Sequence, residues 1–248
     1  MTRDLAWITG ASTGIGRALT LGLVARGWRV AASARPSAAL DALVADGGGA
    51  VTAYPLDVRD AAASAATVDA IEAELGPIAL AVLNAGTYRP SWAAGLDVAA
   101  IRDLVETNLM GTVHGLVPLV QSMIARRNGH VALVASVAGW RGLPGGGAYG
   151  ATKAALINLA ESLKPDLDRH GVALTVIAPG FVRTPLTATN DFPMPFLIDA
   201  DVAARIILDR LPARPFVLSL PRRMALAMGL VRLLPAPILF ALTRRMLR

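Results

Sequence analysis

The sequence has 248 residues, 54% of them hydrophobic and 17% charged, and this size and composition fit a single α/β domain with one large core. It contains no cysteine and only three histidines, which excludes disulfides and thiolate metal sites, so no metal site is expected. The net charge is +6, but six of the 24 basic residues are arginines in the acid-free tail 221–248, leaving 18 basic against 18 acidic residues elsewhere.

Strand-like apolar runs alternate with helical patterns along the chain. The N-terminus carries no apolar signal-peptide core, so a cytoplasmic location is expected. Residues 4–10 form the first apolar run, and apolar residues at helical spacing follow it. Unbroken apolar strands separated by helices predict a single-domain, Rossmann-type, doubly wound parallel sheet over residues 1–220. The other expected strands, about seven in all, are residues 28–35, 50–58, 78–86, 129–137, 172–180 and 214–220.

Three glycines fall in "ITGASTGIGRAL", between the first expected strand and the first helix: Gly10, Gly14 and Gly16. Without side chains the backbone can turn tightly and approach a diphosphate at the helix N-terminus. The alternative is that close packing alone requires the glycines. The spacing is T-G-x-x-x-G-x-G, and in this respect the chain resembles the short-chain dehydrogenase/reductase family.

Further motifs resemble that family in the same order over about residues 5–220: "LDV", "LNAG", "TN", a serine with Y-x-x-x-K, and "PGFVRT". The resemblance implies a nicotinamide cofactor bound along these motifs. The implied contacts are Gly10, Ser12, Thr13, Gly14, Ile15 and Gly16 in the glycine loop, Asp57 and Val58 beside the adenine, Asn84, Ala85 and Gly86 after the fourth strand, Tyr149 and Lys153, and Pro179, Gly180, Val182 and Thr184 on the nicotinamide side.

Tyr149 and Lys153 are four residues apart in a helical pattern, so they share one face of that helix. An adjacent ammonium favours the phenolate and is expected to lower the phenol's pKa, which makes the pair a proton donor and acceptor. Ser136 is expected to hydrogen-bond the substrate oxygen. The resemblance adds that Lys153 holds the nicotinamide ribose and that Asn108 orders a proton-relaying water. An exposed helix turn is the alternative for an isolated Y-x-x-x-K.

The end of the second expected strand, "ASARP", bears on the choice of cofactor. Family members that prefer NAD place an acid where this chain has Ala34, and Arg35 follows. A guanidinium binds phosphate oxygens through several donors, so the sequence predicts NADP. Ser33 is a further candidate contact to the 2′-phosphate. Arg17 is another, with a solvated surface role as its alternative.

The substrate pocket is expected under a lid of about residues 184–198. Its candidate residues are apolar and bulky, which favours an apolar carbonyl or alcohol as substrate. The alternative is that several of them only pack the lid onto the body. The candidates are Trp92, Trp140, Leu143, Phe192, Met194 and Phe196.

The histidines are not expected to be catalytic. His114 lies in an apolar helical run, which indicates a core or interface role, whereas His130 and His170 border turns and are expected to be solvated. Pro165 predicts a kink in the helix that begins near Tyr149. The resemblance also implies a homodimer or homotetramer, formed by the helices containing Asn108 and Tyr149.

These patterns favour an NADP-dependent alcohol dehydrogenase or ketone reductase. A catalytically silent NADP-binding scaffold is the alternative, although such proteins commonly lose the tyrosine, lysine or serine. Nucleic-acid binding is not expected, because the basic excess sits in a leucine-rich tail rather than on a folded face with aromatics.

The tail 221–248 extends beyond the last expected strand. Arg232, Pro235 and Pro237 interrupt its apolar stretch, so two short helices joined at "PAP" are predicted rather than a membrane-spanning one. Peripheral contact with an anionic membrane is one expectation for this segment. Packing on a subunit interface or over the substrate lid is the other.

Overall fold

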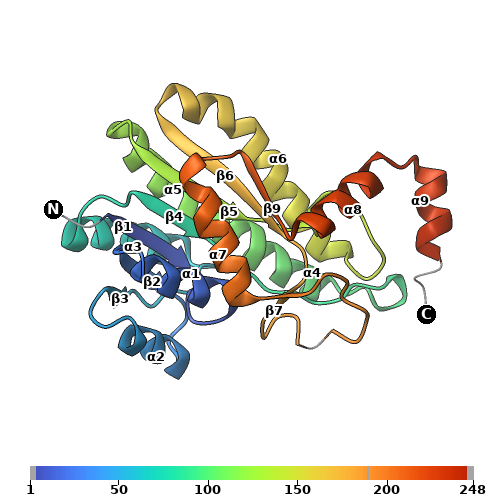
Figure 1. Cartoon of the computed structure of the whole chain (residues 1–248), viewed down its shortest axis with the longest axis horizontal. Helices are drawn as coiled ribbons and strands as arrows, with labels where there is room; N and C mark the ends of the chain where they lie inside the picture. The colour runs from blue at the N-terminus through green and yellow to red at the C-terminus, as the bar shows by residue number, and fades with distance from the viewer. Residues whose placement is uncertain (1–3, 189, 245–248) are drawn as a thin grey trace.

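The computed structural model describes residues 4–188 and 190–244 (Figure 1). Seven parallel strands form one sheet in the order β3-β2-β1-β4-β5-β6-β9, which confirms the predicted doubly wound fold. The order reverses between β1 and β4, where ligands of such sheets bind beyond the carboxyl ends of the strands. The strands are β1 (Leu5–Thr9), β2 (Arg29–Ser33), β3 (Val51–Ala53), β4 (Leu80–Leu83), β5 (Gly129–Val134), β6 (Val172–Pro179) and β9 (Val217–Leu220); β7 (Val182–Arg183) pairs separately with β8 (Ile198–Asp199).

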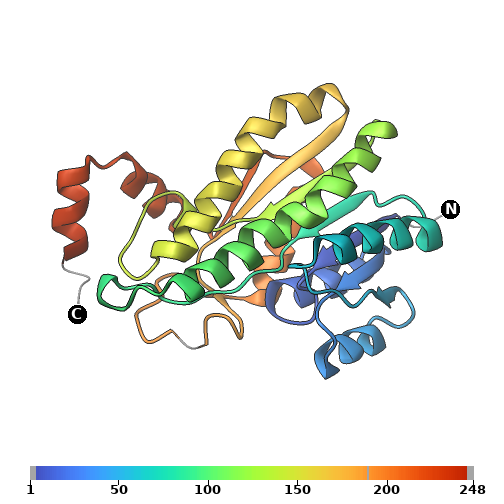
Figure 2. The same ribbon diagram turned by 180° about the vertical axis from the view of Figure 1, so that it is seen from behind.

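Helices cover both faces of the sheet (Figures 1 and 2). The first face carries α1 (Gly14–Val24), α2 (Ala38–Asp46) and α7 (Ala200–Arg210), and the second carries α3 (Ala61–Leu75), α4 (Val98–Val105), α5 (Gly111–Ala125) and α6 (Gly147–Arg169). The short helical turns are η1 (Ala93–Gly95), η2 (Glu106–Met110), η3 (Val137–Gly139) and η4 (Leu211–Ala213).

Alternating side chains of each strand build the two halves of the core. In β1, Ala6 and Ile8 pack with α1, α2 and α7, while Leu5 and Trp7 pack with α3, α5 and α6. The strands therefore need apolar residues on both sides, which explains their unbroken hydrophobic runs. The sheet is buried, and its loops at the carboxyl edge remain available for a site.

Two helices follow β9, as the sequence predicts: α8 (Arg222–Leu233) and α9 (Ala236–Thr243). They extend away from the body at one end of the molecule (Figures 1 and 2). Within residues 4–188 and 190–244, no helix has the length and apolar character needed to cross a bilayer. Residues 245–248 of the predicted tail, and residue 189 of the predicted lid, lie outside the described residues.

α6 continues through Pro165 to Arg169 as one helix, and the kink at the proline stays a prediction. His130 is not solvated, and that prediction was wrong: it lies in β5, is buried, and its Nε2 is 2.9 Å from the Thr175 hydroxyl. Because Thr175 donates its proton to the Pro215 carbonyl, Nε2 must be the donor to Thr175. Burial, with a smaller effect of Arg214, lowers the pKa of His130 to about 4.

This burial predicts a pH-dependent loss of stability. The folded protein keeps His130 neutral, whereas the unfolded chain takes up a proton below the ordinary pKa of 6.5, so stability falls as pH drops toward 4. We expect the unfolding free energy of the wild type to fall by about 3 kcal/mol relative to that of His130→Gln across this range. Urea denaturation at a series of pH values measures the difference, and parallel curves for the two proteins would contradict it.

Candidate active site

The three predicted glycines lie at the turn from β1 into α1, and Gly10 and Gly14 have the positive φ that glycine adopts readily. Gly10 has a φ of +64°, and a Cβ there would lie 2.8 Å from the Ala85 Cα. A Cβ on Gly16 would lie 2.2 Å from the Gly10 carbonyl oxygen. Close packing is by itself enough to require glycine at both positions, which was the alternative to a diphosphate site. Their presence alone does not establish a ligand.

The N-terminus of α1 supplies an independent indication of an anion site. Thr13 precedes the helix but makes no side-chain cap, and the first turn contains no acidic residue. α6, α7, α8 and α9 likewise lack a side-chain cap, whereas Ser37, Asp60 and Asp97 cap α2, α3 and α4. The first-turn N–H groups of α1, from Gly14 onward, thus have no capping side chain, and a helix N-terminus of this kind favours a phosphate. Of the predicted contacts, Ser12 lies in the loop before α1 and Ile15 in its first turn, and both are half-buried.

The "LNAG" segment is fastened to the glycine loop by a residue that the sequence analysis missed, Thr9. The Thr9 hydroxyl oxygen accepts from the backbone N–H groups of Asn84 and Ala85, at 3.0 and 3.1 Å. The Asn84 side chain donates to the carbonyls of Thr9 and Gly10. Thr9 ends β1 as part of the "TG" pair, and its role could have been inferred from that motif. The two loops form one rigid unit beside the switch point.

Asn108 is fully buried in the π-helical turn η2, between α4 and α5. Its Oδ1 accepts from the Thr87 N–H at 2.7 Å, and its Nδ2 donates to the Thr87 carbonyl and to the Thr152 hydroxyl. Such π-turns often mark functional sites. The side chain ties η2 to α6 and to the loop after β4, while its water-relaying role stays a prediction.

Ser136 follows β5 and is buried next to α6. Its hydroxyl donates to the Pro179 carbonyl at 3.3 Å and accepts from the Ala138 N–H at 3.1 Å. The turn after Ser136 lies tightly on α6, because a Cβ on Gly139 would be 2.7 Å from the Lys153 carbonyl carbon. Gly139, which the sequence analysis did not select, therefore fixes the position of Ser136 relative to the helix that carries the tyrosine.

Tyr149 and Lys153 lie on the same side of α6, with Nζ 5.7 Å from the centre of the tyrosine ring. Nζ donates to the Val134 carbonyl at 2.8 Å. The Tyr88 ring packs edge-on against Tyr149, with ring centres 5.1 Å apart. A Cβ on Gly86 would be 3.2 Å from Asn108 Oδ1 and 3.5 Å from Lys153 Nζ, so these groups all converge at one place.

The expected lowering of the phenol's pKa was wrong. Burial raises the pKa of Tyr149 to about 12, although a hydrogen-bonding interaction with Ser136 lowers it and Tyr88 adds to the rise. Burial also lowers the pKa of Lys153 to about 8. Desolvation outweighs the attraction because the ammonium is directed at the Val134 carbonyl rather than at the phenol oxygen.

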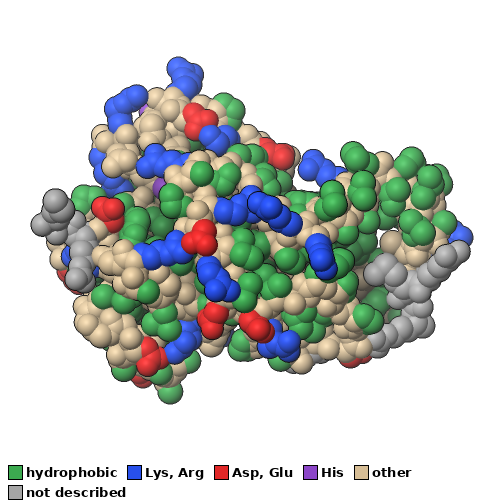
Figure 3. Space-filling view, in the orientation of Figure 1, with side chains coloured by type: hydrophobic (Ala, Val, Ile, Leu, Met, Phe, Trp, Pro, Cys, Tyr) green, Lys and Arg blue, Asp and Glu red, His purple; other side chains and the backbone are tan. Residues whose placement is uncertain are grey.

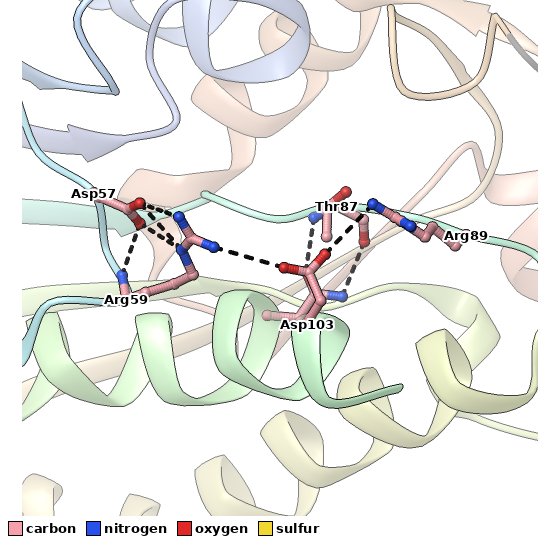
Figure 4. Close-up of polar contacts among 6 residues, drawn as sticks. Asp57, Arg59, Thr87, Arg89 and Asp103 are labelled. Atoms are coloured by element: carbon pink, nitrogen blue, oxygen red, sulfur yellow. Dashed lines mark hydrogen bonds and ion pairs between the residues drawn. The ribbon is translucent and has the colours of Figure 1, made fainter. Parts of the chain in front are cut away.

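Asp57 lies at the predicted adenine-side turn, but its carboxylate is already engaged by Arg59 (Figure 4). The side-chain hydrogen bond from Arg59 keeps the pKa of Asp57 below its ordinary value. Arg59 also approaches Asp103 of α4 at 3.7 Å, and Arg89 reaches Asp103 from the other side at 3.9 Å. Because Arg59 donates to both carboxylate oxygens, Asp57 has only its remaining lone pairs to offer to an adenine. Val58 is buried, and its carbonyl lies 2.9 Å from the His114 Nδ1.

The residues around the end of β2 separate into two groups. Arg35 is exposed, and its side chain makes no hydrogen bond or ion pair within the part of the chain that the structure describes. Ser33 was wrongly selected as a phosphate contact, because it is buried at the end of β2 and accepts from the Trp7 indole N–H at 2.9 Å. Arg17 forms an ion pair with Asp46, as its surface alternative predicts.

The "PGFVRT" segment leads from β6 to the lid beside the glycine loop. Pro179 ends β6 next to Ser136, and Val182 is buried in β7. Thr184 lies against Gly14, whose Cβ would be 3.0 Å from the threonine methyl. A Cβ on Gly180 would lie 2.5 Å from the Met224 Cγ, so the segment touches both the glycine loop and α8.

The expected substrate residues are only partly brought together. Trp140 and Leu143 pack with Phe181, Met224 and Met228, three residues that the sequence analysis missed. Phe192 of the lid stacks edge-on against Phe181, with ring centres 5.9 Å apart. Met194 accepts a hydrogen bond from Asn190, Trp92 lies against Gly145, and Phe196 remains exposed. The candidate residues that pack together are apolar, and two methionines of α8 pack with them.

These features fit a nicotinamide dinucleotide. The uncapped helix suits its diphosphate, the exposed Arg35 lies past the next strand, and Tyr149 and Lys153 lie together on α6.

Comparison with known proteins agrees with this geometry. Residues 4–192 match the model of a family described as short chain dehydrogenase. The chain is 39% identical to an uncharacterized oxidoreductase of Myxococcus xanthus, over 99% of this chain and 98% of the other. It is 34% identical to the 3-oxoacyl-[acyl-carrier-protein] reductase of Escherichia coli, over 74% and 75%. A crystal structure of a short-chain dehydrogenase from Streptomyces avermitilis superposes with a TM-score of 0.80 at 29% identity, covering 88% of each chain.

Proposed function

The chain belongs to the short-chain dehydrogenase family of oxidoreductases, and on that premise we propose that it is an NADP-dependent reductase of apolar ketones, and in reverse a dehydrogenase of the corresponding alcohols. The observation that carries the proposal is the convergence of Ser136, Tyr149 and Lys153 beside Gly86 and Asn108. The reduced cofactor, when bound, supplies the hydride that the carbonyl carbon receives.

Side chains of the protein donate the proton and stabilise the charges that form. With its pKa raised to about 12, the Tyr149 phenol is fully protonated at neutral pH, so it is ready to donate its proton to the carbonyl oxygen. Ser136 donates a second hydrogen bond to the same oxygen as negative charge develops there. Lys153, charged below a pKa of about 8, stabilises the phenolate that remains and binds the ribose.

The proposed class of substrate, an apolar carbonyl compound, rests on the apolar character of the candidate substrate residues. Trp140, Leu143 and Phe181 offer contacts to hydrocarbon and no charged partner. The Escherichia coli relative is a reductase of 3-oxoacyl groups on a carrier protein, so 3-oxoacyl thioesters belong in the substrate panel beside steroids, aryl ketones and aldehydes. NADPH consumption against this panel tests the proposal. Binding of NADPH without turnover of any carbonyl would instead favour the catalytically silent scaffold.

We expect Arg35→Ala to weaken NADPH binding about ten- to hundred-fold and to leave NADH binding unchanged, because only NADPH carries the 2′-phosphate that the guanidinium would contact. The loss corresponds to about 1.5–3 kcal/mol for a charge-assisted hydrogen bond. Fluorescence titration with each cofactor measures both constants. Arg169→Ala, an exposed arginine where α6 ends, is the matched control. Equal weakening of both cofactors would show that Arg35 does not select between them.

A further inference from the structure

The C-terminal arm, defined here as residues 222–244, exposes an unusual amount of apolar surface. Leu226, Leu230 and Leu233 are spaced by four and three residues, so they share one face of α8. They are 69%, 61% and 78% exposed. Figure 3 shows hydrophobic side chains gathered over the arm. Large apolar residues scattered singly are ordinary on a protein surface, but a contiguous group marks an interaction site.

The second helix of the arm continues this surface. Ile238, Phe240 and Leu242 of α9 are all about half exposed or more. The arm extends from the body, so α9 offers them to the surroundings rather than to the core (Figures 1 and 2). The arm also lies beyond residues 4–192, the part that matches the family model. The exposed surface is thus a feature of this segment and is not needed to build the sheet.

The opposite face of α8 already has its partner. Met224 and Met228 are buried against Trp140, Leu143 and Phe181. Arg141 fastens the arm further, because its Nη2 donates to the Leu234 carbonyl at 3.0 Å. The body therefore holds α8 by its methionine face and turns the leucine face outward.

The charges of the arm are all of one sign. Four arginines lie in it, all exposed: Arg222, Arg223, Arg232 and Arg244. It contains no aspartate or glutamate, and no ion pair joins these arginines to any of the described residues. Arginine side chains can lay their aliphatic stems along an apolar surface while the guanidinium stays in a polar layer. The partner must accept apolar side chains and supply anions at the same level.

A second copy of the chain does not meet this requirement. Pairing of two arms about a two-fold axis would bring arginines against arginines with no acid between them. The remainder of the chain has as many basic as acidic residues and offers no net complement. The interface of an anionic bilayer supplies both chemistries together. At 12 and 8 residues, α8 and α9 are too short to span it, so they would lie in its surface.

We propose that the C-terminal arm docks the protein on the surface of an anionic phospholipid bilayer, with Leu226, Leu230, Leu233 and the exposed residues of α9 inserted among the lipids and the arginines at the headgroups. The binding strength depends on both parts of the arm. Each arginine near an anionic surface contributes about a fivefold gain in affinity, which salt weakens, whereas the apolar contribution persists at high salt.

Flotation of the full-length protein with phosphatidylcholine vesicles, with and without phosphatidylglycerol, tests the proposal. We expect binding at low salt to the vesicles that contain phosphatidylglycerol and little to the others. The triple variant Leu226→Ser, Leu230→Ser, Leu233→Ser should bind at least tenfold more weakly. The double variant Arg222→Gln, Arg223→Gln should lose about twenty-five-fold and show a reduced salt dependence.

Val117→Ser is the matched control, because Val117 is 49% exposed on α5, outside the C-terminal arm, and should leave vesicle binding unchanged. All substituted residues are exposed, so circular dichroism should show unaltered folding. Failure of the wild type to float with anionic vesicles would overturn the proposal. So would a leucine variant that floats equally well, or one that changes only the oligomeric state in light scattering, which would make the arm a protein contact. The flotation assay contains no cofactor or substrate, so its outcome is independent of the proposed reaction.

Discussion

Replacement of Tyr149 by phenylalanine is expected to lower kcat for carbonyl reduction about a hundred- to ten-thousand-fold, the usual contribution of a positioned acid. The substitution removes only the phenol oxygen. The ring would still pack edge-on against Tyr88, so the apolar contacts of the site are retained. NADPH binding should remain within a few-fold of the wild type, because the glycine loop and Lys153 are unchanged. Steady-state kinetics and cofactor titration separate the two effects.

Tyr54→Phe is the control for the loss of a phenol. Tyr54 lies after β3, and its hydroxyl donates to Glu74 at the surface. This variant should keep full activity. Reduction by Tyr149→Phe at a rate close to that of the wild type would remove the phenol from the mechanism and leave Ser136 or solvent as the proton source.

Replacement of Lys153 by methionine is expected to have the second large effect. The ammonium is buried and donates to the Val134 carbonyl beside Tyr149, and methionine preserves the volume without the charge. We expect kcat/KM to fall about a hundred- to thousand-fold, because the phenolate formed during reduction loses its nearest cation. The KM for NADPH should rise as well, since the proposed ribose contact is lost.

The pH dependence of kcat/KM is a second measurement of the role of Lys153. Burial lowers the pKa of Lys153 to about 8, so the wild-type kcat/KM should fall as pH rises through about 8, where the ammonium becomes neutral. Lys153→Met has no such group, and its residual activity should show no fall there. A wild-type profile that is flat up to pH 10, where an ordinary lysine remains charged, would contradict the role assigned to the buried ammonium.

The elements that local sequence determines were predicted well. Apolar runs buried on both faces identify parallel strands, and all seven are present, although the run 50–58 contains only the three residues of β3. The remaining residues of that run, which include Asp57, leave the strand and form a turn at the edge of the sheet. The four-residue spacing of Tyr149 and Lys153 also placed them correctly, because a single helix carries both.

Features that depend on distant parts of the chain were not predicted. Burial of the phenol, which raises the pKa of Tyr149, depends on what surrounds it. The end of a strand does not show which face a side chain takes, so Ser33 was assigned to the cofactor although it points at Trp7. Met224 and Met228 pack with the substrate candidates Trp140 and Leu143, which lie more than 80 residues earlier in the chain, and no periodicity links the two pairs.

Assay of the full-length protein with NADPH and the carbonyl panel tests the central claim most directly, by following the loss of NADPH absorbance. We expect turnover of at least one apolar ketone or 3-oxoacyl thioester, faster with NADPH than with NADH and lowered about a hundredfold or more in Tyr149→Phe. NADPH binding with no turnover of any carbonyl, or turnover in Tyr149→Phe at close to the wild-type rate, would contradict the proposed reaction.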